Sequence, residues 1–275
     1  MTSKVKKIAW GRGIFVYLML FLFLVPFYII VNNSFKTTEQ FITNPFEPAS
    51  SITFKNYVLA FERMNYISAI SNSSIITVFS VAAIILTASM AAYFLVRFHW
   101  KINKVIFAIM VASMIVPFQA IMIPLVSIYG SFNALNNKWI LIFMYLGFGQ
   151  SFAVFICHGF IKNIPLELEE AALIDGCNRV QSYFKVVFPN LMPILVTLMI
   201  LDVLWIWNDY LLPSMILLSP SQRTLPLSTY SFFSTYSVDF TPLMASLVMT
   251  ILPVIILYIL GQKQIIKGVV QGAIK

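Results

Sequence analysis

Hydrophobic residues along this chain gather in six long runs, which shorter polar segments separate. Each run holds about 18 or more residues, the length that a helix needs to cross the hydrocarbon core of a membrane. The runs occupy residues 14–31, 70–96, 105–128, 139–161, 191–218 and 242–260. We therefore predict an all-α integral membrane protein with six spans, forming a single transmembrane domain over residues 1–275.

The first run has the basic flank of a signal peptide but lacks its cleavage site. Asn32-Asn33-Ser34 follows the run, and no small-x-small pattern precedes it. We expect an uncleaved first span. The third run is interrupted by Pro117 and Pro124, with Gln119 between them. Such breaks are tolerated where neighbouring helices or a wet cavity satisfy the freed carbonyl groups, so Gln119 is a cavity candidate.

Charged residues cluster between the fourth and fifth runs, in residues 162–190. Pro165 suits the first position of a helix, and the three acids that follow it are favoured there by the helix dipole. These acids are Glu167, Glu169 and Glu170. Gly176 offers a left-handed stop, and Asn178 is suited to cap a second helix that Pro189 ends. The second helix carries an apolar stripe, expected to pack mainly on the protein's own helices: Val180, Tyr183, Phe184, Val187 and Phe188.

Composition and charge support a membrane protein and indicate its orientation. Only 10% of residues are charged and 60% are hydrophobic, with a mean hydropathy of +0.88. The formal net charge of +8 would suggest nucleic-acid binding in a soluble chain, but basic loop residues in a membrane chain mark its cytoplasmic side. Thirteen fall on one side: Lys4, Lys6, Lys7, Arg12, Arg97, Lys101, Lys104, Lys162, Arg179, Lys185, Lys263, Lys267 and Lys275. Five fall on the other: Lys36, Lys55, Arg63, Lys138 and Arg223. Both termini and residues 162–190 are therefore predicted to face the cytoplasm.

Two acids, Asp202 and Asp209, fall inside a predicted span. A carboxylate within a membrane is costly, so each is expected to face the protein interior or a wet cavity. At about 100° per residue, both lie on one helix face with Trp205. A carboxylate beside an indole suits a sugar, whose hydroxyls bond to the acid and whose apolar face stacks on the ring. An equal alternative is that Asn208 and Asp209 only join neighbouring helices or cap an unwound turn.

The remaining patterns offer no catalytic chemistry. The sequence contains no GxxxxGK[ST] phosphate loop and no GxGxxG motif after a strand, so we do not expect the chain to hydrolyse ATP itself. Cys157 and Cys177 imply neither a disulfide framework nor a metal site. His99 is expected at the membrane interface, and His158 near headgroups or backbone, without a catalytic role.

A spaced set of residues within 162–190 carries a resemblance to a known family. The set is Glu170-Ala171-Ala172, Gly176, Val186 and Phe188-Pro189. It resembles the EAA loop of ABC-importer permeases, which usually has isoleucine and leucine where this chain has Val186 and Phe188. Both changes keep the apolar character. Asp175, directly before Gly176, resembles the carbohydrate-uptake branch, similar to the smaller permease of maltose-type importers.

Shorter matches extend the resemblance over nearly the whole chain. Trp207-Asn208-Asp209-Tyr210 resembles the family's Trp-Asn-acid-aromatic motif. Gly268, Gly272 and Lys275 match its C-terminal pattern. Ser34-Phe35-Lys36 and Phe54-Lys55-Asn56-Tyr57 resemble the external loop of sugar permeases.

The resemblance implies a type I importer permease fold with six transmembrane helices and a cytoplasmic two-helix coupling loop. The implied function is one half of the pathway of an ATP-driven importer for sugars, with an oligosaccharide expected, in a bacterial cell membrane. The implied partners are a second homologous permease, two cytoplasmic ATPase subunits, an extracellular or periplasmic sugar-binding protein and membrane lipid. No nucleic acid is expected. ATP and magnesium would be used by the partner ATPase, with no cofactor bound by this chain.

The implied sites fall into three groups. Contacts with the ATPase are expected from Glu169, Glu170, Ala171, Ala172, Asp175, Gly176 and Arg179. The substrate pathway is expected at Gln119, Asp202, Trp205, Asn208 and Asp209. The tail contact is expected at Gly268, Gly272 and Lys275.

Two other classes of function remain as alternatives. A self-contained secondary transporter or channel for a small polar solute would show coupling-ion sites or inverted repeats, and we find no such repeat. A membrane enzyme would need a nucleophile–base set or a metal cluster, which the sequence does not offer. Co-purification with an ATPase would separate the importer from both.

Overall fold

The computed structural model describes residues 3–234 and 237–273, and the side chains of residues 13–234 and 237–262. Within these residues the chain is helical, apart from loops and an isolated antiparallel bridge between Phe233 and Val238. Five helices are long and apolar enough to cross a membrane, and a bent pair brings the number of spans to six if it counts as one. The predicted all-α class is confirmed.

The helices follow one another with short connections. The α-helices are α1 Ser3–Ser34, α2 Thr38–Thr43, α3 Lys55–Arg63, α4 Tyr66–Arg97, α5 Lys101–Ser113, α6 Phe118–Ser131, α7 Lys138–Ile161, α8 Glu167–Ile174, α9 Arg179–Ser182, α10 Phe188–Asn208, α11 Leu211–Ile216, α12 Leu225–Ser228 and α13 Phe240–Ala273. A π-helical turn, Tyr183–Val187, joins α9 to α10, and 3-10 turns form at Pro220–Gln222 and Thr229–Phe232.

The first of two compact units comprises Met1–Tyr66 and Ser228–Pro253. Its polar loop is ordered by the two short motifs that the sequence singled out. The Asn56 side chain donates to the carbonyls of Ser34 and Lys36 at 2.8 and 2.7 Å, and the Tyr57 and Ser34 hydroxyls lie 2.7 Å apart. Lys36 is fully buried, and its ammonium group is satisfied by the Asn44 carbonyl at 2.8 Å.

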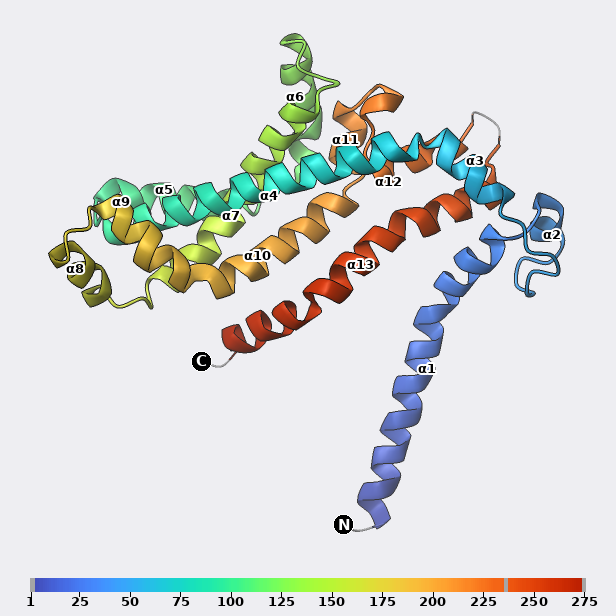
Figure 1. The fold of residues 1–275 in the computed structure, drawn as a ribbon, viewed down its shortest axis with the longest axis horizontal. Helices are drawn as coiled ribbons and strands as arrows, with labels where there is room; N and C mark the ends of the chain where they lie inside the picture. Colours follow the sequence, from blue (N-terminus) through green and yellow to red (C-terminus); the bar gives the residue numbers. More distant parts are fainter. Residues whose placement is uncertain (1–2, 235–236, 274–275) are drawn as a thin grey trace. The chain divides into compact units, whose positions relative to one another are not determined.

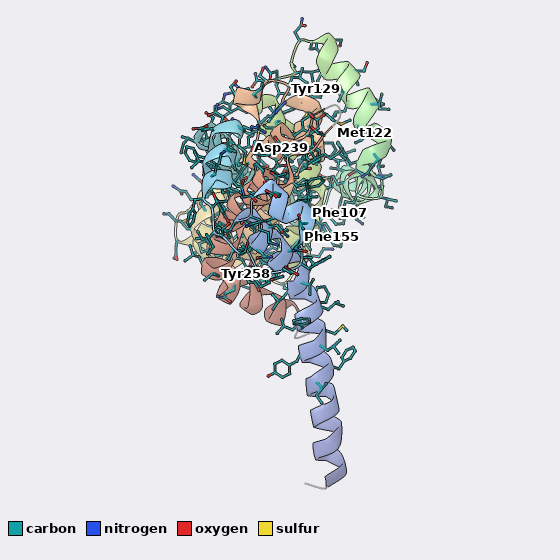
Figure 2. The ribbon with its side chains drawn as sticks, turned by 90° about the vertical axis from the view of Figure 1, so that its right-hand side faces the viewer. Phe107, Met122, Tyr129, Phe155, Asp239 and Tyr258 are labelled. Atoms are coloured by element: carbon teal, nitrogen blue, oxygen red, sulfur yellow. The ribbon has the colours of Figure 1, made fainter. Side chains whose placement is uncertain are left out.

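The second unit comprises Ile67–Leu227 and Val254–Lys275, and α4, α7 and α10 form its core. Close packing of α7 depends on Gly149, because a Cβ there would lie 2.6 Å from Ile84 Cδ1 of α4. On one flank Phe107 of α5 stacks on Phe155 of α7, with ring centroids 6.4 Å apart (Figure 2). The short helices α8 and α9 lie at one end of these long helices, and α11 lies towards the other (Figure 1).

The third span is bent by 101° between α5 and α6. Pro117 lies directly before α6 with φ −68°, and a proline restricts the residue before it to extended backbone, so the chain leaves the helix at residues 114–117. Pro124 lies inside α6 without ending it. The predicted interruption is therefore confirmed at the first proline only.

The fifth span differs from the predicted residues 191–218 at both ends. Pro189 does not end the preceding helix, because the π-helical turn shifts the hydrogen bonds there and the Phe188 N–H donates to the Tyr183 carbonyl. Helix therefore runs without interruption over Arg179–Asn208. The span stops at Asp209, whose backbone is extended and whose Oδ1 accepts the Leu211 N–H at 2.9 Å. The sixth span was predicted to end at residue 260, but the helix that contains it, α13, extends to Ala273.

Candidate functional site

The loop segment, residues 162–190, folds as the sequence predicts around its glycine. Gly176 has φ +88°, a left-handed conformation that a residue with a Cβ enters only with strain. Asn178 caps α9 by accepting the Gln181 N–H at 2.9 Å, and the Gln181 side chain accepts the Asn178 N–H at 2.9 Å. The predicted placement of Pro165 at the first helical position is wrong, because α8 begins two residues later, at Glu167. The turn between α8 and α9 is thus encoded locally.

Glu169 points inward rather than towards solvent. Its residue is 3% exposed, and Oε1 accepts from Arg97 Nε at 2.6 Å. Its other oxygen accepts from the Tyr93 hydroxyl at 2.8 Å, and Arg97 also donates to the Ile164 carbonyl at 2.9 Å. Tyr93 and Arg97 both belong to the last turns of α4. A charge-assisted network therefore holds the back of α8 on α4.

A second contact joins the same two parts of the chain. The Tyr183 hydroxyl donates to Ser89 Oγ of α4 at 2.8 Å, and the Tyr183 ring lies 5.0 Å from that of Tyr93. The π-helical turn is therefore attached to α4 beside the Glu169 network. Tyr93, Arg97 and Ser89 of α4 are members of this site that the sequence pattern does not predict. The available sequence signal was the spacing of Glu169 and Ala172, which lie three residues apart and so share one face of α8. In the structure both residues are buried.

The outer face of the loop segment is open. Glu170, Ala171, Asp175 and Gly176 are exposed, and nothing lies within 4 Å of where a Gly176 Cβ would be. Ile174 beside them is 85% exposed. Leu173 and Val180 of the same segment are also exposed, at 36% and 65%. Several exposed large apolar side chains in one short segment are typical of a surface that another protein covers.

The predicted packing of the apolar stripe is only partly right. Tyr183 and Val187 are buried, but Val180 is 65% and Phe184 46% exposed. The stripe spans a wide arc of the helix, and the core contacts only one edge of it. Arg179 is exposed and lies with its guanidinium 5.6 Å from the centre of the Phe98 ring, a cation–π contact with the turn after α4.

The two intramembrane acids have different surroundings, although the helical pattern places them on one face. Asp202 is 4% exposed, and its Oδ2 has no hydrogen-bond partner among the described residues. It lines a pocket of about 260 Å³ with Trp205 and Gly149. Asp209 instead accepts the Tyr145 hydroxyl at 2.8 Å and terminates the span. Asn208 donates to the Leu204 carbonyl of its own helix.

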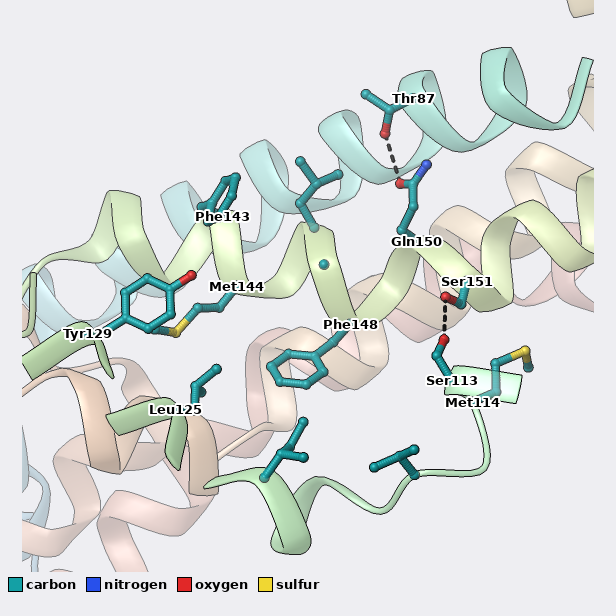
Figure 3. Close-up of a pocket in the computed structure, with 14 residues that line it drawn as sticks. Thr87, Ser113, Met114, Leu125, Tyr129, Phe143, Met144, Phe148, Gln150 and Ser151 are labelled. Atoms are coloured by element: carbon teal, nitrogen blue, oxygen red, sulfur yellow. Dashed lines mark hydrogen bonds between the residues drawn. The ribbon is translucent and has the colours of Figure 1, made fainter. Parts of the chain in front are cut away.

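A larger pocket lies where the third span bends. It encloses about 700 Å³ between α4, α7 and the α5–α6 pair (Figure 3). Two polar pairs line it at mid-span, Thr87 with Gln150 at 2.9 Å and Ser113 with Ser151 at 2.9 Å. Gln119, which the sequence placed at such a cavity, is exposed at the start of α6 and does not line it. The sequence signal for this pocket was the polar residues within otherwise apolar runs.

Two of the three residues of the predicted tail contact lie within the described backbone. Gly268 and Gly272 lie in the backbone of α13, and Lys275 lies outside the described residues. Among the residues that the structure describes, no group of three or more His, Cys, Asp or Glu is placed to hold a metal ion.

Comparisons with known proteins place this geometry in a wider context. Residues 83–270 match the family described as binding-protein-dependent transport system inner membrane component. The chain is 45% identical, over 92% of both chains, to a probable starch degradation products transport system permease protein of Thermoanaerobacterium thermosulfurigenes. It is 35% identical, over 91% of both, to a melibiose/raffinose/stachyose import permease protein of Bacillus subtilis. A bacterial ABC transporter involved in the import of the acidic polysaccharide alginate has a chain of the same fold, with a TM-score of 0.83 at 22% identity, covering 96% of this chain and 98% of that one.

Proposed function

Because the chain belongs to the family of binding-protein-dependent transport system inner membrane components, we propose that it is a permease subunit of an ATP-driven importer for sugars. Several relatives support this substrate class, since they are described as permeases for starch degradation products or for melibiose, raffinose and stachyose. An oligosaccharide is the proposed cargo.

The observation that carries the proposal is the two-sided construction of the loop segment. Its outer face presents Glu170, Ala171 and Asp175 around the left-handed Gly176, while its inner face is held on α4 by the buried Glu169–Arg97 pair. A partner that pushes or pulls α8 would therefore move α4 with it, because breaking a buried ion pair costs about 3–5 kcal/mol. We assign the outer face to contact with a cytoplasmic ATPase. Glu169 and Ala172, which are buried, serve the inner attachment.

The assembly that follows has several subunits. We propose a second homologous permease, two ATPase subunits that bind ATP and magnesium, and an external sugar-binding protein. The excess of basic residues on one side, thirteen against five, supports an orientation with both termini and the loop segment in the cytoplasm.

For the pathway we propose the pocket at the bend of the third span together with Asp202 and Trp205. Irregular backbone at membrane depth is tolerated where it lines a water-filled cavity, which fits residues 114–117. Hydroxyl and amide groups such as Thr87 and Gln150 are suited to neutral sugar hydroxyls. Asp209 and Asn208 are assigned a structural role, because both are engaged in bonds that shape the end of α10.

The experiment is to co-express the tagged chain with the proposed partner subunits and to purify it through the tag. Uptake of a labelled oligosaccharide into proteoliposomes is then measured. We expect an ATPase subunit to co-purify and uptake to require ATP and the sugar-binding protein. Uptake that an ion gradient drives without ATP would overturn the proposal in favour of a secondary transporter.

A further inference from the structure

A pocket of about 360 Å³ lies between the end of α4, the start of α5 and the end of α7, away from the proposed pathway. We call it the basic pocket. Its charged lining consists of Lys104 and Lys162, and its aromatic lining includes Trp100 and Phe107. No carboxylate lines it. The two ion pairs among the described residues, Arg63–Asp239 and Arg97–Glu169, involve neither lysine.

The start of α5 adds to the preference of this pocket for an anion. The helix has 13 residues, no acid in its first turn and no side-chain cap on its N-terminal N–H groups. Unsatisfied N–H groups and the helix dipole both attract negative charge. Two lysines and a helix N-terminus without a side-chain cap therefore share one pocket.

A buried acceptor in the same pocket points to a ligand that also carries a donor. Asn103 is 3% exposed, and its Nδ2 donates to the Phe98 carbonyl at 2.6 Å. Its Oδ1 is buried without a hydrogen-bond partner. A buried acceptor left unsatisfied is costly, so a hydroxyl donor from a bound molecule would stabilise this site.

The surroundings of the pocket are suited to lipid. Trp100, which lines the pocket, is 55% exposed, and Phe155 of α7 beside it is 44% exposed. Phe107, which also lines the pocket, stacks on His158 with ring centroids 3.8 Å apart. It stacks on Phe155 as well (Figure 2). A molecule with an anionic head in the pocket would thus have an apolar surface for its tail.

We propose that the basic pocket binds the headgroup of an anionic phospholipid that carries a free hydroxyl, such as phosphatidylglycerol. Lys104 and Lys162 hold the phosphate, and Asn103 Oδ1 accepts a headgroup hydroxyl. Basic pockets between helix ends are suited to anionic headgroups on the cytoplasmic side. The assignment to the cytoplasmic leaflet rests on the proposed function and its orientation, whereas the binding itself does not.

The test is native mass spectrometry of the purified permease complex with three lipids of identical acyl chains. These are phosphatidylglycerol, phosphatidylmethanol, which has the same charge without a headgroup hydroxyl, and phosphatidylcholine, which has no net charge. We expect retention in that order. Equal retention of phosphatidylglycerol and phosphatidylmethanol would remove the role of Asn103, and equal retention of all three would overturn the proposal.

Charge removal gives a matched comparison. Each basic side chain near a membrane surface contributes about a fivefold factor in binding, so the Lys104→Gln/Lys162→Gln double variant should bind phosphatidylglycerol about 25-fold more weakly. Lys101→Gln removes a neighbouring exposed charge outside the pocket and should change binding less than twofold. Equal effects of the two variants would overturn the proposal. Displacement of the lipid by millimolar inorganic phosphate would also overturn it, because free phosphate would then be the ligand. The same holds if the mass that leaves the complex is a protein subunit and not a lipid. Because lipid retention needs no ATP, its failure is distinguishable from failure of the importer assignment.

Discussion

Two carboxylates of the second unit are almost equally buried but differ in how their charge is balanced. Glu169 has a guanidinium and a phenol within hydrogen-bond distance, whereas Asp202 Oδ2 has no partner. A paired buried charge contributes mainly to holding two elements in one arrangement. An unpartnered one is costly and is therefore expected where a function requires it.

Removing one member of the Glu169–Arg97 pair should destabilise the chain strongly. Glu169→Ala leaves the Arg97 guanidinium, whose side chain is 11% exposed, without its carboxylate, at a cost of about 3–5 kcal/mol. Glu170→Ala is the matched control, since Glu170 is the exposed neighbour. Thermal unfolding of the purified complex should show a clear loss of stability for the first variant only. A double variant, Arg97→Met with Glu169→Met, should recover much of the loss. Indistinguishable unfolding of the two alanine variants would contradict the network.

Asp202 and Asp209 should respond differently to loss of charge. Asp202→Asn keeps the shape of a residue proposed to line the pathway, so we expect slower sugar uptake with normal assembly. Asp209→Ala removes the acceptor of Tyr145 and of the Leu211 N–H, which should cost about 1–3 kcal/mol of stability. Uptake and thermal unfolding measured side by side distinguish these effects. Normal uptake by Asp202→Asn would remove it from the pathway.

Between α8 and α9, a substitution at Gly176 would test backbone strain separately from steric overlap. A side chain at Gly176 would meet no atom within 4 Å, so substitution there costs only the left-handed backbone. Asn tolerates this conformation, whereas a β-branched residue is penalised by roughly 1–2 kcal/mol. We therefore expect Gly176→Val to re-aim α9 against α8 and to weaken stimulation of ATP hydrolysis by the sugar-loaded binding protein. Gly176→Asn should retain most of it. Equal, normal stimulation in both variants would reduce the loop segment to a connector.

The loop segment also shows which features a sequence can specify. The left-handed Gly176 and the Asn178 cap were predictable because each depends on a few adjacent residues. The inward direction of Glu169 was not, because its partner Arg97 is 72 residues away in sequence. The early end of the fifth span was open for a similar reason: the sequence offered a capping role for Asp209 as one of two alternatives, and its partner Tyr145 of α7 is 64 residues away. Apolar runs likewise predicted the spans but not the π-helical turn, which lets helix continue past Pro189.

At the scale of the whole molecule, a permease of this construction is incomplete alone. The most hydrophobic window of α1 has no residue buried within the chain, and only 17% of that in α13 is buried. These faces require lipid or another subunit. The exposed apolar residues of the loop segment, such as Ile174 and Val180, require a different cover, because the proposed orientation places them in water. Membrane orientation therefore decides which exposed surfaces are available to which partner.

That orientation has a direct chemical test with a probe already present in the chain. Cys177 lies half-buried in the loop segment and Cys157 is buried in α7, so Cys177 is the accessible native thiol among the described residues. An impermeant thiol reagent should leave Cys177 unlabelled in intact cells and label it after permeabilisation. Ser221→Cys places a second thiol at an exposed position in the segment between α11 and α12, on the predicted external side. In a Cys177→Ser background it should be labelled in intact cells. Labelling of Cys177 from outside would invert the topology, and the assignment of the loop segment to a cytoplasmic ATPase would fail with it.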